Sequence, residues 1–207
     1  MRIRKATQED FLRVYQFTAG CPPMENYPEH VYKIILRYFA DSCFIAEENG
    51  QIIGFAMGIV PQSFPGTLFL WEMGVAPSYQ RQGIGGKLVR EMENELKKLG
   101  FHRIELTIDP ANLPSRKLFK KMGYQNISER VGKTIEVEGN LAVQDYYKPG
   151  RHFMVYEKRI GESEAKRTGI CKTDIDIMAV HPKIHMLLKS GETPKSQLAT
   201  ANSSLRR

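Results

Sequence analysis

The stretch VAPSYQRQGIGGKLV, residues 75–89, decides the fold of this chain. It places three glycines, Gly83, Gly85 and Gly86, directly before an apolar run with the period of a helix. A glycine inside a helix costs about 1 kcal/mol relative to alanine, so three glycines at a helix start need a reason. Free backbone N–H groups at a helix start attract anions, and glycines let a phosphate approach the backbone. The stretch therefore predicts a phosphate-binding loop between a strand and a helix.

Two common phosphate-binding motifs do not fit this loop. The dinucleotide fingerprint GxGxxG fails because Leu88 stands where its third glycine would be. A P-loop needs Gly-Lys-Ser/Thr after a widely spaced glycine, whereas here Leu88 follows Lys87. The pattern that remains is Gln80-x-x-Gly83-x-Gly85.

The residues after the glycines predict an amphipathic helix. Leu88, Met92, Leu96 and Leu99 recur at spacings of four, four and three, which we expect to form one buried stripe.

Composition bounds the class of protein. The net charge of +7 is compatible with a nucleic acid, a membrane surface or a small polyanion such as a nucleotide cofactor. Lysines and arginines are spread along the chain rather than clustered with aromatics, which does not favour nucleic acid. No apolar stretch approaches the roughly 20 residues of a membrane span, and the polar start MRIRKATQEDF lacks the apolar core of a signal peptide. Cys21, Cys43 and Cys171 lack CxxC spacing, so we expect a reducing, cytoplasmic setting and no metal site.

Patterns along the chain predict a mixed α/β domain over residues 1–160 with the order βααβββαβαββ. Thr7 and Asp10 form a capping-box pattern before the first helix, and Asn49-Gly50 is the preferred turn pair of a type I′ hairpin.

A C-terminal extension, 161–190, contains an apolar patch at 174–188 that is a candidate homodimer surface, and 191–207 has the composition of a disordered tail. The expected strands are 1–7, the two halves of 42–60, 67–77, 102–109, 124–130 and 151–160, and the expected helices are 11–20, 28–42, the segment after the glycines and 112–124.

The motif Gln80-x-x-Gly83-x-Gly85 resembles the pyrophosphate loop of the GNAT superfamily of acetyl-CoA-dependent N-acetyltransferases. The strand before it, the helix after it, IELTID (104–109), and Asn112 followed by LFKKMGY (118–124) extend the resemblance across about residues 1–160. The resemblance implies a central, mostly antiparallel α+β sheet that is splayed between its fourth and fifth strands. It also implies acetyl-CoA as the acetyl donor and a primary amine as the acceptor.

The same resemblance assigns a coenzyme site. The N–H of Met73 would point at the thioester carbonyl, where charge develops in the transition state, and Val75 would pair its backbone with pantetheine. Gly74 suits the bulge that a splay requires. Asn112 would contact the coenzyme, or cap the next helix, or do both. The expected coenzyme-binding residues are Met73, Val75, Gln80, Arg81, Gln82, Gly83, Ile84, Gly85, Gly86, Lys87, Asn112 and Phe119.

The catalytic acid is where this sequence departs from the family. Many members carry a tyrosine at the position of Phe119, and phenylalanine cannot donate a proton. Tyr146 and Tyr147 are the candidates to replace it, with Tyr147 preferred as the catalytic residue. Glu72 is the expected base. Because side chains alternate along a strand, Glu72 and Trp71 should face opposite ways unless a bulge changes the phase.

Two resemblances within the superfamily point to different acceptors. DYYKPGRHFMVYEKRI (145–160), with Tyr146 and Tyr147, resembles protein N-terminal acetyltransferases, in which such a pair holds the acceptor peptide. LFLWEMGVAPS (68–78) is similar to diaminobutyrate acetyltransferases, in which a tryptophan matching Trp71 lines the site and Glu25 and Tyr32 would grip a diamine.

Three functions therefore stay open from the sequence. The first is acetylation of a protein or peptide N-terminal amine, and the alternative is acetylation of a small diamine or amino acid. The third is a non-catalytic module that binds or senses an acyl-CoA, which the phenylalanine at 119 would suit.

Overall fold

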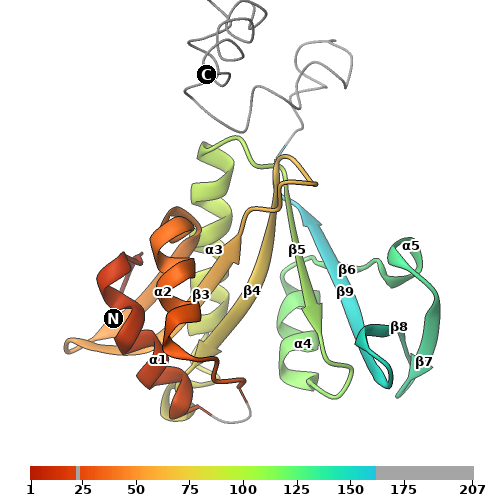
Figure 1. The fold of residues 1–207 in the computed structure, drawn as a ribbon, viewed down its shortest axis with the longest axis horizontal. Helices are drawn as coiled ribbons and strands as arrows, with labels where there is room; N and C mark the ends of the chain where they lie inside the picture. The colour runs from red at the N-terminus through yellow and green to blue at the C-terminus, as the bar shows by residue number, and fades with distance from the viewer. Residues whose placement is uncertain (22–23, 162–207) are drawn as a thin grey trace, which may run out of the picture.

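One mixed sheet forms the centre of the described part of the chain, residues 1–21 and 24–161 of a computed structural model (Figure 1). The strand order is β1-β2-β3-β4-β5-β9-β8-β7, and β6 pairs with β9. Among the strands of the described residues, β4 and β5 are the one parallel pair and all other neighbours are antiparallel. The strands are β1 (Arg2–Lys5), β2 (Cys43–Glu48), β3 (Gln51–Ile59), β4 (Thr67–Val75), β5 (Arg103–Ile108), β6 (Gln125–Asn126), β7 (Thr134–Val137), β8 (Asn140–Lys148) and β9 (Arg151–Arg159).

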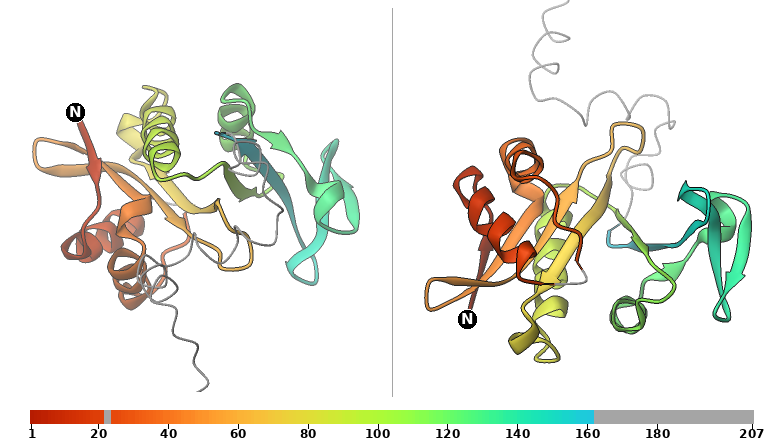
Figure 2. Two further views of the ribbon diagram at one scale, coloured as in Figure 1. Left: turned by 90° about the horizontal axis from the view of Figure 1, so that it is seen from above. Right: turned by 60° about the horizontal axis from the view of Figure 1, so that its bottom comes forward.

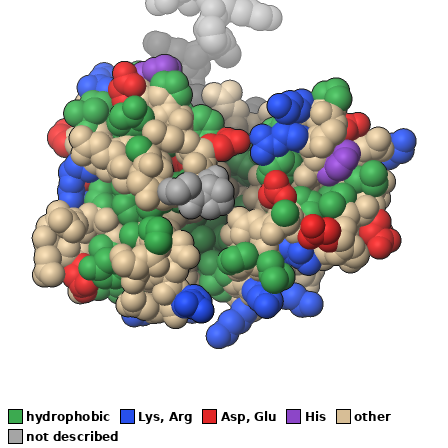
Figure 3. Space-filling model, turned by 90° about the horizontal axis from the view of Figure 1, so that it is seen from below, with side chains coloured by type: hydrophobic (Ala, Val, Ile, Leu, Met, Phe, Trp, Pro, Cys, Tyr) green, Lys and Arg blue, Asp and Glu red, His purple; other side chains and the backbone are tan. Residues whose placement is uncertain are grey.

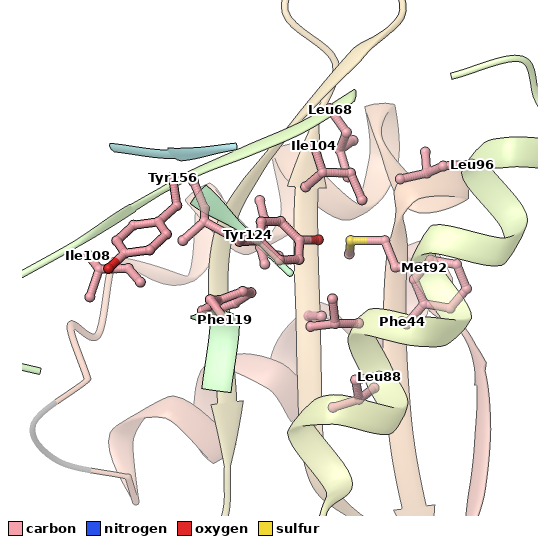
Figure 4. Packing of buried hydrophobic residues seen from close by; sticks show 14 of the residues in the cluster. Phe44, Leu68, Leu88, Met92, Leu96, Ile104, Ile108, Phe119, Tyr124 and Tyr156 are labelled. Carbon is pink, nitrogen blue, oxygen red and sulfur yellow. The ribbon is translucent and has the colours of Figure 1, made fainter. Parts of the chain in front are cut away.

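Helices cover both faces of the sheet (Figure 2). The helices α1 and α2 lie on one face, where Tyr32, Phe55 and Met57 are buried, and α3 and α4 lie on the other. The second core, shown in Figure 4, joins Leu88 and Met92 of α3 to the strands. The helices are α1 (Phe11–Ala19), α2 (Glu29–Tyr38), α3 (Ile84–Lys98), α4 (Leu113–Lys121) and α5 (Ser128–Val131), with 3-10 turns at Gln8–Asp10, Ala40–Ser42 and Pro77–Tyr79.

Two local predictions are confirmed by backbone geometry. Asn49 (φ 50°) and Gly50 (φ 76°) both have positive φ, as a type I′ turn requires. Thr7 and Asp10 form the predicted capping box, in which the Thr7 N–H donates to the Asp10 carboxylate at 2.9 Å.

The sheet is splayed between β4 and β5, as the resemblance implied. Thr67–Leu70 of β4 pair with Arg103–Leu106 of β5, and the pairing then stops. Beyond Leu70 the two strands diverge toward the lower end of Figure 1, while β4 continues to pair with β3 and β5 with β9. The splay therefore leaves an open backbone edge along residues 71–75.

The region after α4 differs from the prediction. The expected strand 124–130 is reduced to the two residues of β6, because Ser128 starts the helix α5. The strands β7 and β8 were missed; they are joined at Glu138 and Gly139, which both have positive φ, but Glu-Gly is not a preferred hairpin pair. The stripe on α3 is also shorter than predicted, since Leu99 is the C-cap residue and 54% exposed.

The bulge in β4 lies at Trp71 and not at Gly74, which corrects the sequence-based expectation. Met57 pairs with Glu72 and Gly58 pairs with Leu70, so Trp71 has no partner on β3. At Gly74 an added Cβ would lie 2.0 Å from Met24 Cε. Gly74 is therefore a site of close approach by the segment between α1 and α2.

Several expectations lie outside the described residues. These are the extension 161–190 apart from its first residue, the tail 191–207, the apolar patch at 174–188 and Cys171. Within residues 1–21 and 24–161, none of the helices is long and apolar enough to cross a membrane.

Candidate active site

Trp71 and Glu72 face the same layer of the protein, although they are neighbours on a strand. The bulge at Trp71 interrupts the alternation of side chains. Trp71 packs with the core beneath α1 and α2, and Glu72 lies close to Tyr32 of the same core. Met73 and Leu70 face the α3 side. The bulge thus places an aromatic ring beside a carboxylate at the start of the splay.

Glu72 has the chemistry of a general base. Both of its carboxylate oxygens are shielded from solvent and have no hydrogen-bond partner among the described residues. Burial disfavours the ionised form, and the nearby negative charge of Glu25 disfavours it further, so the pKa of Glu72 is raised to about 8, an effect that Tyr32 partly offsets. In its ionised form, which predominates above about pH 8, a carboxylate with this pKa is a stronger base than an ordinary glutamate and can accept a proton from an amine.

Aromatic side chains form one wall of this site. The rings of Tyr27 and Trp71 lie 4.7 Å apart between centroids. Tyr32 is fully buried in α2, and its hydroxyl accepts a hydrogen bond from the Tyr27 N–H at 3.2 Å. Tyr32 therefore lies beneath the site and orders the loop, whereas Tyr27 and Glu25 reach its entrance. The hydroxyl of Tyr27 donates to Glu25 at 2.5 Å.

The opposite wall comes from β8 and β5. The hydroxyl oxygens of Tyr147 and Thr107 lie 3.0 Å apart, at the point where β5 has parted from β4. Tyr147 is 55% exposed and packs edge-on against Tyr146, with ring centroids 4.7 Å apart. Tyr146 is turned toward the small core of Ile127, Val143 and Val155. Of the predicted pair, Tyr147 is the residue whose hydroxyl lies at the splay.

The glycine loop has the geometry of an anion cradle. Gly83 adopts φ +78° and has open space where a Cβ would stand. Because α3 starts at Ile84, the N–H groups of its first turn lack intrahelical partners. Gln80 and Gln82 fold back on the loop, donating to the carbonyls of Val75 and Ser78 at 3.1 and 3.2 Å. These two side chains therefore shape the loop.

The remaining loop residues divide by exposure. Arg81, at φ +61°, and Lys87 are exposed and place positive charge beside the loop. Ile84 is buried in the α3 core. The side chains nearest to a Cβ built on Gly85 are Leu118, Met73 and Val75, at 3.4 to 3.8 Å. The glycine loop thus adjoins the free edge of β4.

Asn112 and Phe119 hold structural positions. The Asn112 side-chain oxygen accepts from the Ser115 N–H at 3.1 Å and caps α4. Phe119 is only 4% exposed and packs edge-on against Tyr124 in the core. A coenzyme contact of either residue stays a prediction.

Three residues of the site were missed from the sequence. Tyr27 lies two residues after Glu25, a predicted acceptor-binding residue, and its aromatic ring was the available signal. Thr107 lies on β5 and Arg151 starts β9, and Arg151 Nη1 lies 3.3 Å from Glu25 Oε1. Their roles depend on contacts between residues far apart in the sequence, and local sequence patterns do not predict such contacts.

Figure 3 shows the protein from below, at the end where β4 and β5 diverge. Apolar side chains lie between the two halves of the protein there, and Lys and Arg side chains lie near the edge of this face. A splayed sheet, a free strand edge and a glycine loop at a helix start define the acyl-CoA N-acyltransferase fold. The model of the Acetyltransferase (GNAT) family matches residues 7–124. The chain belongs to this family.

Relatives of the chain carry one recurrent name. A protein named L-2,4-diaminobutyric acid acetyltransferase from Halomonas elongata is 32% identical over 121 residues, which cover 58% of this chain and 63% of that protein. The chain thus spans less than two thirds of that relative. A protein of the same name from Wolinella succinogenes is 27% identical over 141 residues, 67% of this chain and 78% of that protein.

Solved structures share the fold. The diaminobutyrate acetyltransferase EctA from Paenibacillus lautus, in complex with L-2,4-diaminobutyric acid and coenzyme A, superimposes with a TM-score of 0.61 at 24% identity, covering 78% of this chain and 96% of that one. The ribosomal-protein-S18-alanine N-acetyltransferase from Escherichia coli gives a TM-score of 0.59 at 20% identity, covering 78% and 95%.

Proposed function

We propose that this protein transfers an acetyl group from acetyl-CoA to a primary amine of a small diamine. The observation that carries the proposal is the unpartnered, shielded carboxylate of Glu72 beside the splay, with a second carboxylate, Glu25, near enough to raise its pKa. This choice reverses the order of the two acceptors that the sequence favoured.

The acceptor amine must lose its proton before it can attack. An alkylamine has a pKa near 10.4 and is therefore almost entirely protonated at neutral pH. Glu72, with its pKa raised to about 8, accepts that proton more readily than an ordinary carboxylate does. Ionised Glu72 also attracts the ammonium form into the site, so one residue both binds and activates the amine.

A diamine suits two carboxylates better than one. Glu25 is held by the Tyr27 hydroxyl at the entrance and is exposed, while the carboxylate oxygens of Glu72 are shielded from solvent. One amine would remain protonated on Glu25 and the other would be deprotonated by Glu72. The Tyr27 and Trp71 rings would contact the methylene groups of the diamine and attract its cation through their faces. The name shared by several relatives agrees with this acceptor class.

The coenzyme fits the other side of β4. When bound, acetyl-CoA supplies the activated acetyl thioester. The first turn of α3 and Gly83, Gly85 and Gly86 would hold its pyrophosphate, with Arg81 and Lys87 adding positive charge. The free edge of β4 at Met73 and Val75 offers backbone groups to an extended chain. Tyr147 would donate a proton to the leaving thiolate, and the position of its hydroxyl beside Thr107 at the splay supports this role.

A peptide N-terminal amine is the second candidate. The exposed ring of Tyr147 beside Tyr146 supports it, since such a pair can flank an extended peptide.

The test is product analysis by mass spectrometry. The purified protein with acetyl-CoA is offered 1,3-diaminopropane, 2,4-diaminobutyrate and a set of free-amine peptides in separate reactions. We expect mono-acetylated diamine products and little or no peptide product. Acetylated peptides alone would overturn the proposal in favour of the second candidate. Acetyl-CoA binding without turnover would favour the non-catalytic module.

A matched variant ties the activity to the site. Glu72→Gln keeps the shape of the side chain and removes the base, so we expect turnover to fall at least 100-fold while acetyl-CoA binding stays the same. Glu48→Gln, at the remote end of β2, is the control and should leave turnover unchanged.

A further inference from the structure

An ion pair crosses the entrance of the splay. Arg151 Nη1, at the start of β9, lies 3.3 Å from Glu25 Oε1, in the segment between α1 and α2. These residues are 126 positions apart in the sequence and belong to the two halves that the splay separates. The pair therefore joins the Glu72 side of the entrance to the Tyr147 side.

The β9 side of the entrance carries a second cation. Lys148 is the register partner of Arg151 in the β8–β9 hairpin. Its charge, with that of Arg151, contributes to a lowered pKa of Glu25, for which the hydrogen bond from Tyr27 is the largest cause. Glu25 thus faces two cations across the entrance, Arg151 and Lys148.

The Glu25–Arg151 pair is weak enough to be exchanged. The Arg151 side chain is 42% exposed and that of Glu25 is 56% exposed. An exposed ion pair contributes only about 0–1 kcal/mol. Each partner also has a second support, because Tyr27 holds Glu25 and the Arg151 guanidinium lies 5.2 Å from the centre of the Phe153 ring. Both groups therefore keep their positions when the pair opens.

We propose that Arg151 binds a carboxylate of the acceptor, so that the enzyme prefers a diamino acid to a plain diamine. This inference rests on the proposed function. The acceptor's ammonium replaces Arg151 on Glu25, and the acceptor's carboxylate replaces Glu25 on Arg151. The exchange leaves no charge unpaired. Arginine suits this role because its planar fork binds a carboxylate through two parallel hydrogen bonds.

The experiment compares two acceptors that differ only in the carboxylate, 2,4-diaminobutyrate and 1,3-diaminopropane. The quantity measured is the ratio of their kcat/KM values in the full chain and in Arg151→Gln. We expect the variant to reduce this ratio about tenfold, mainly through KM for the amino acid, because one charge-assisted contact is lost. The kcat/KM for 1,3-diaminopropane should stay the same or rise, since Glu25 is no longer paired.

Two further variants make the result specific. Arg151→Lys keeps the charge but loses the fork, so it should fall between the parent and Arg151→Gln. Arg130→Gln removes an arginine of α5 that pairs with Glu157 of β9 at 2.9 Å, and it should leave the ratio unchanged. An unchanged ratio in Arg151→Gln, with both diamines still acetylated, would overturn this inference alone. A parent protein that acetylates neither diamine would overturn the proposed function, and this inference with it.

Discussion

Lys158 Nζ lies 2.8 Å from both carboxylate oxygens of Glu93 and thereby joins β9 to α3. The Tyr124 hydroxyl donates to the same carboxylate at 3.1 Å. Glu93 is buried, and burial of the Tyr124 hydroxyl together with the negative charge of Glu93 raises the pKa of Tyr124 well above its usual range. The helix that carries the glycine loop is thus fixed to the far half of the sheet by one buried carboxylate.

Glu93→Gln should lower the free energy of unfolding by about 2–3 kcal/mol. Removing one partner of a buried ion pair leaves the other charge uncompensated. Urea denaturation measures the change, with Glu91→Gln, exposed on the same helix, as the control. A loss no larger than that of Glu91→Gln would contradict the role assigned to this pair.

The rate should depend on pH through Glu72. Its ionised form is the proposed base, so kcat/KM for the diamine, which reports the pKa of the free enzyme, should rise with pH, with a midpoint near 8. Glu25→Gln removes a negative charge that raises the pKa of Glu72, and the midpoint should then move to lower pH. Log(kcat/KM) against pH, recorded for both proteins, checks the direction. A midpoint that does not move would show that the charge of Glu25 does not affect the pKa of the group that controls the rate.

The raised pKa of Glu72 also means that ionised Glu72 lowers the free energy of unfolding at high pH. The folded protein holds the Glu72 proton to about pH 8, whereas the unfolded chain loses it near 4.5. This contribution to stability is therefore complete below about pH 4.5 and is lost as the pH rises to about 8.

Glu72→Gln lacks this loss. Glu72→Gln should match the parent near pH 4 and exceed it at pH 8.5 by on the order of 3–5 kcal/mol, at about 1.4 kcal/mol per pKa unit. Urea unfolding at the two pH values measures the difference in free energy of unfolding between the variant and the parent. All other groups titrate alike in the two proteins, so their contributions largely cancel. Equal stability at pH 8.5 would show that Glu72 is not an isolated buried carboxylate.

Gly85→Glu should weaken acetyl-CoA binding at least 100-fold and leave the fold intact. The new side chain would start beside Leu118 and Met73, and its negative charge would oppose the pyrophosphate. Gly85→Ala is the matched control, because its Cβ meets only ordinary contacts at 3.4 Å and beyond. Isothermal titration gives the affinities, and circular dichroism checks the fold. Unchanged affinity in Gly85→Glu would show that the glycine loop does not bind the pyrophosphate of acetyl-CoA.

Trp71 provides a direct signal of acceptor binding. It is the one tryptophan of the chain, and its ring lies 4.7 Å from that of Tyr27. Titration with 1,3-diaminopropane should change its fluorescence emission in a saturable way. Tyr27→Ala should weaken the apparent affinity about tenfold, because an aromatic wall and the support of Glu25 are lost together. Tyr38→Ala, exposed on α2, serves as the control.

Local signals in the sequence were enough to predict the frame of the protein. The glycine loop, the Asn49-Gly50 hairpin and the Thr7 cap depend on residues close together in the chain, so their conformations could be predicted without the fold. The same holds for Asn112, whose capping role depends on a neighbour three residues away.

The composition of the acceptor site could be predicted only in part. Glu25, Trp71, Glu72 and Tyr147 were named as candidates, but alternation along β4 predicted that Trp71 and Glu72 would face opposite ways. The bulge depends on the register in which β3 pairs with β4, which the pattern of β4 alone does not specify. The contact of Arg151 with Glu25 joins residues 126 positions apart, and it forms only after both halves of the sheet are in place.

The bulge at Trp71 also bears on how this site can change over evolution. Without Trp71, the residues Leu70, Glu72 and Met73 would alternate regularly and still face the sides they face now. The tryptophan is therefore a one-residue addition that supplies an aromatic surface without displacing Glu72 or the free edge of β4. Under the proposed function, gain or loss of that single residue would alter which acceptors are admitted and leave the chemistry of transfer as it was.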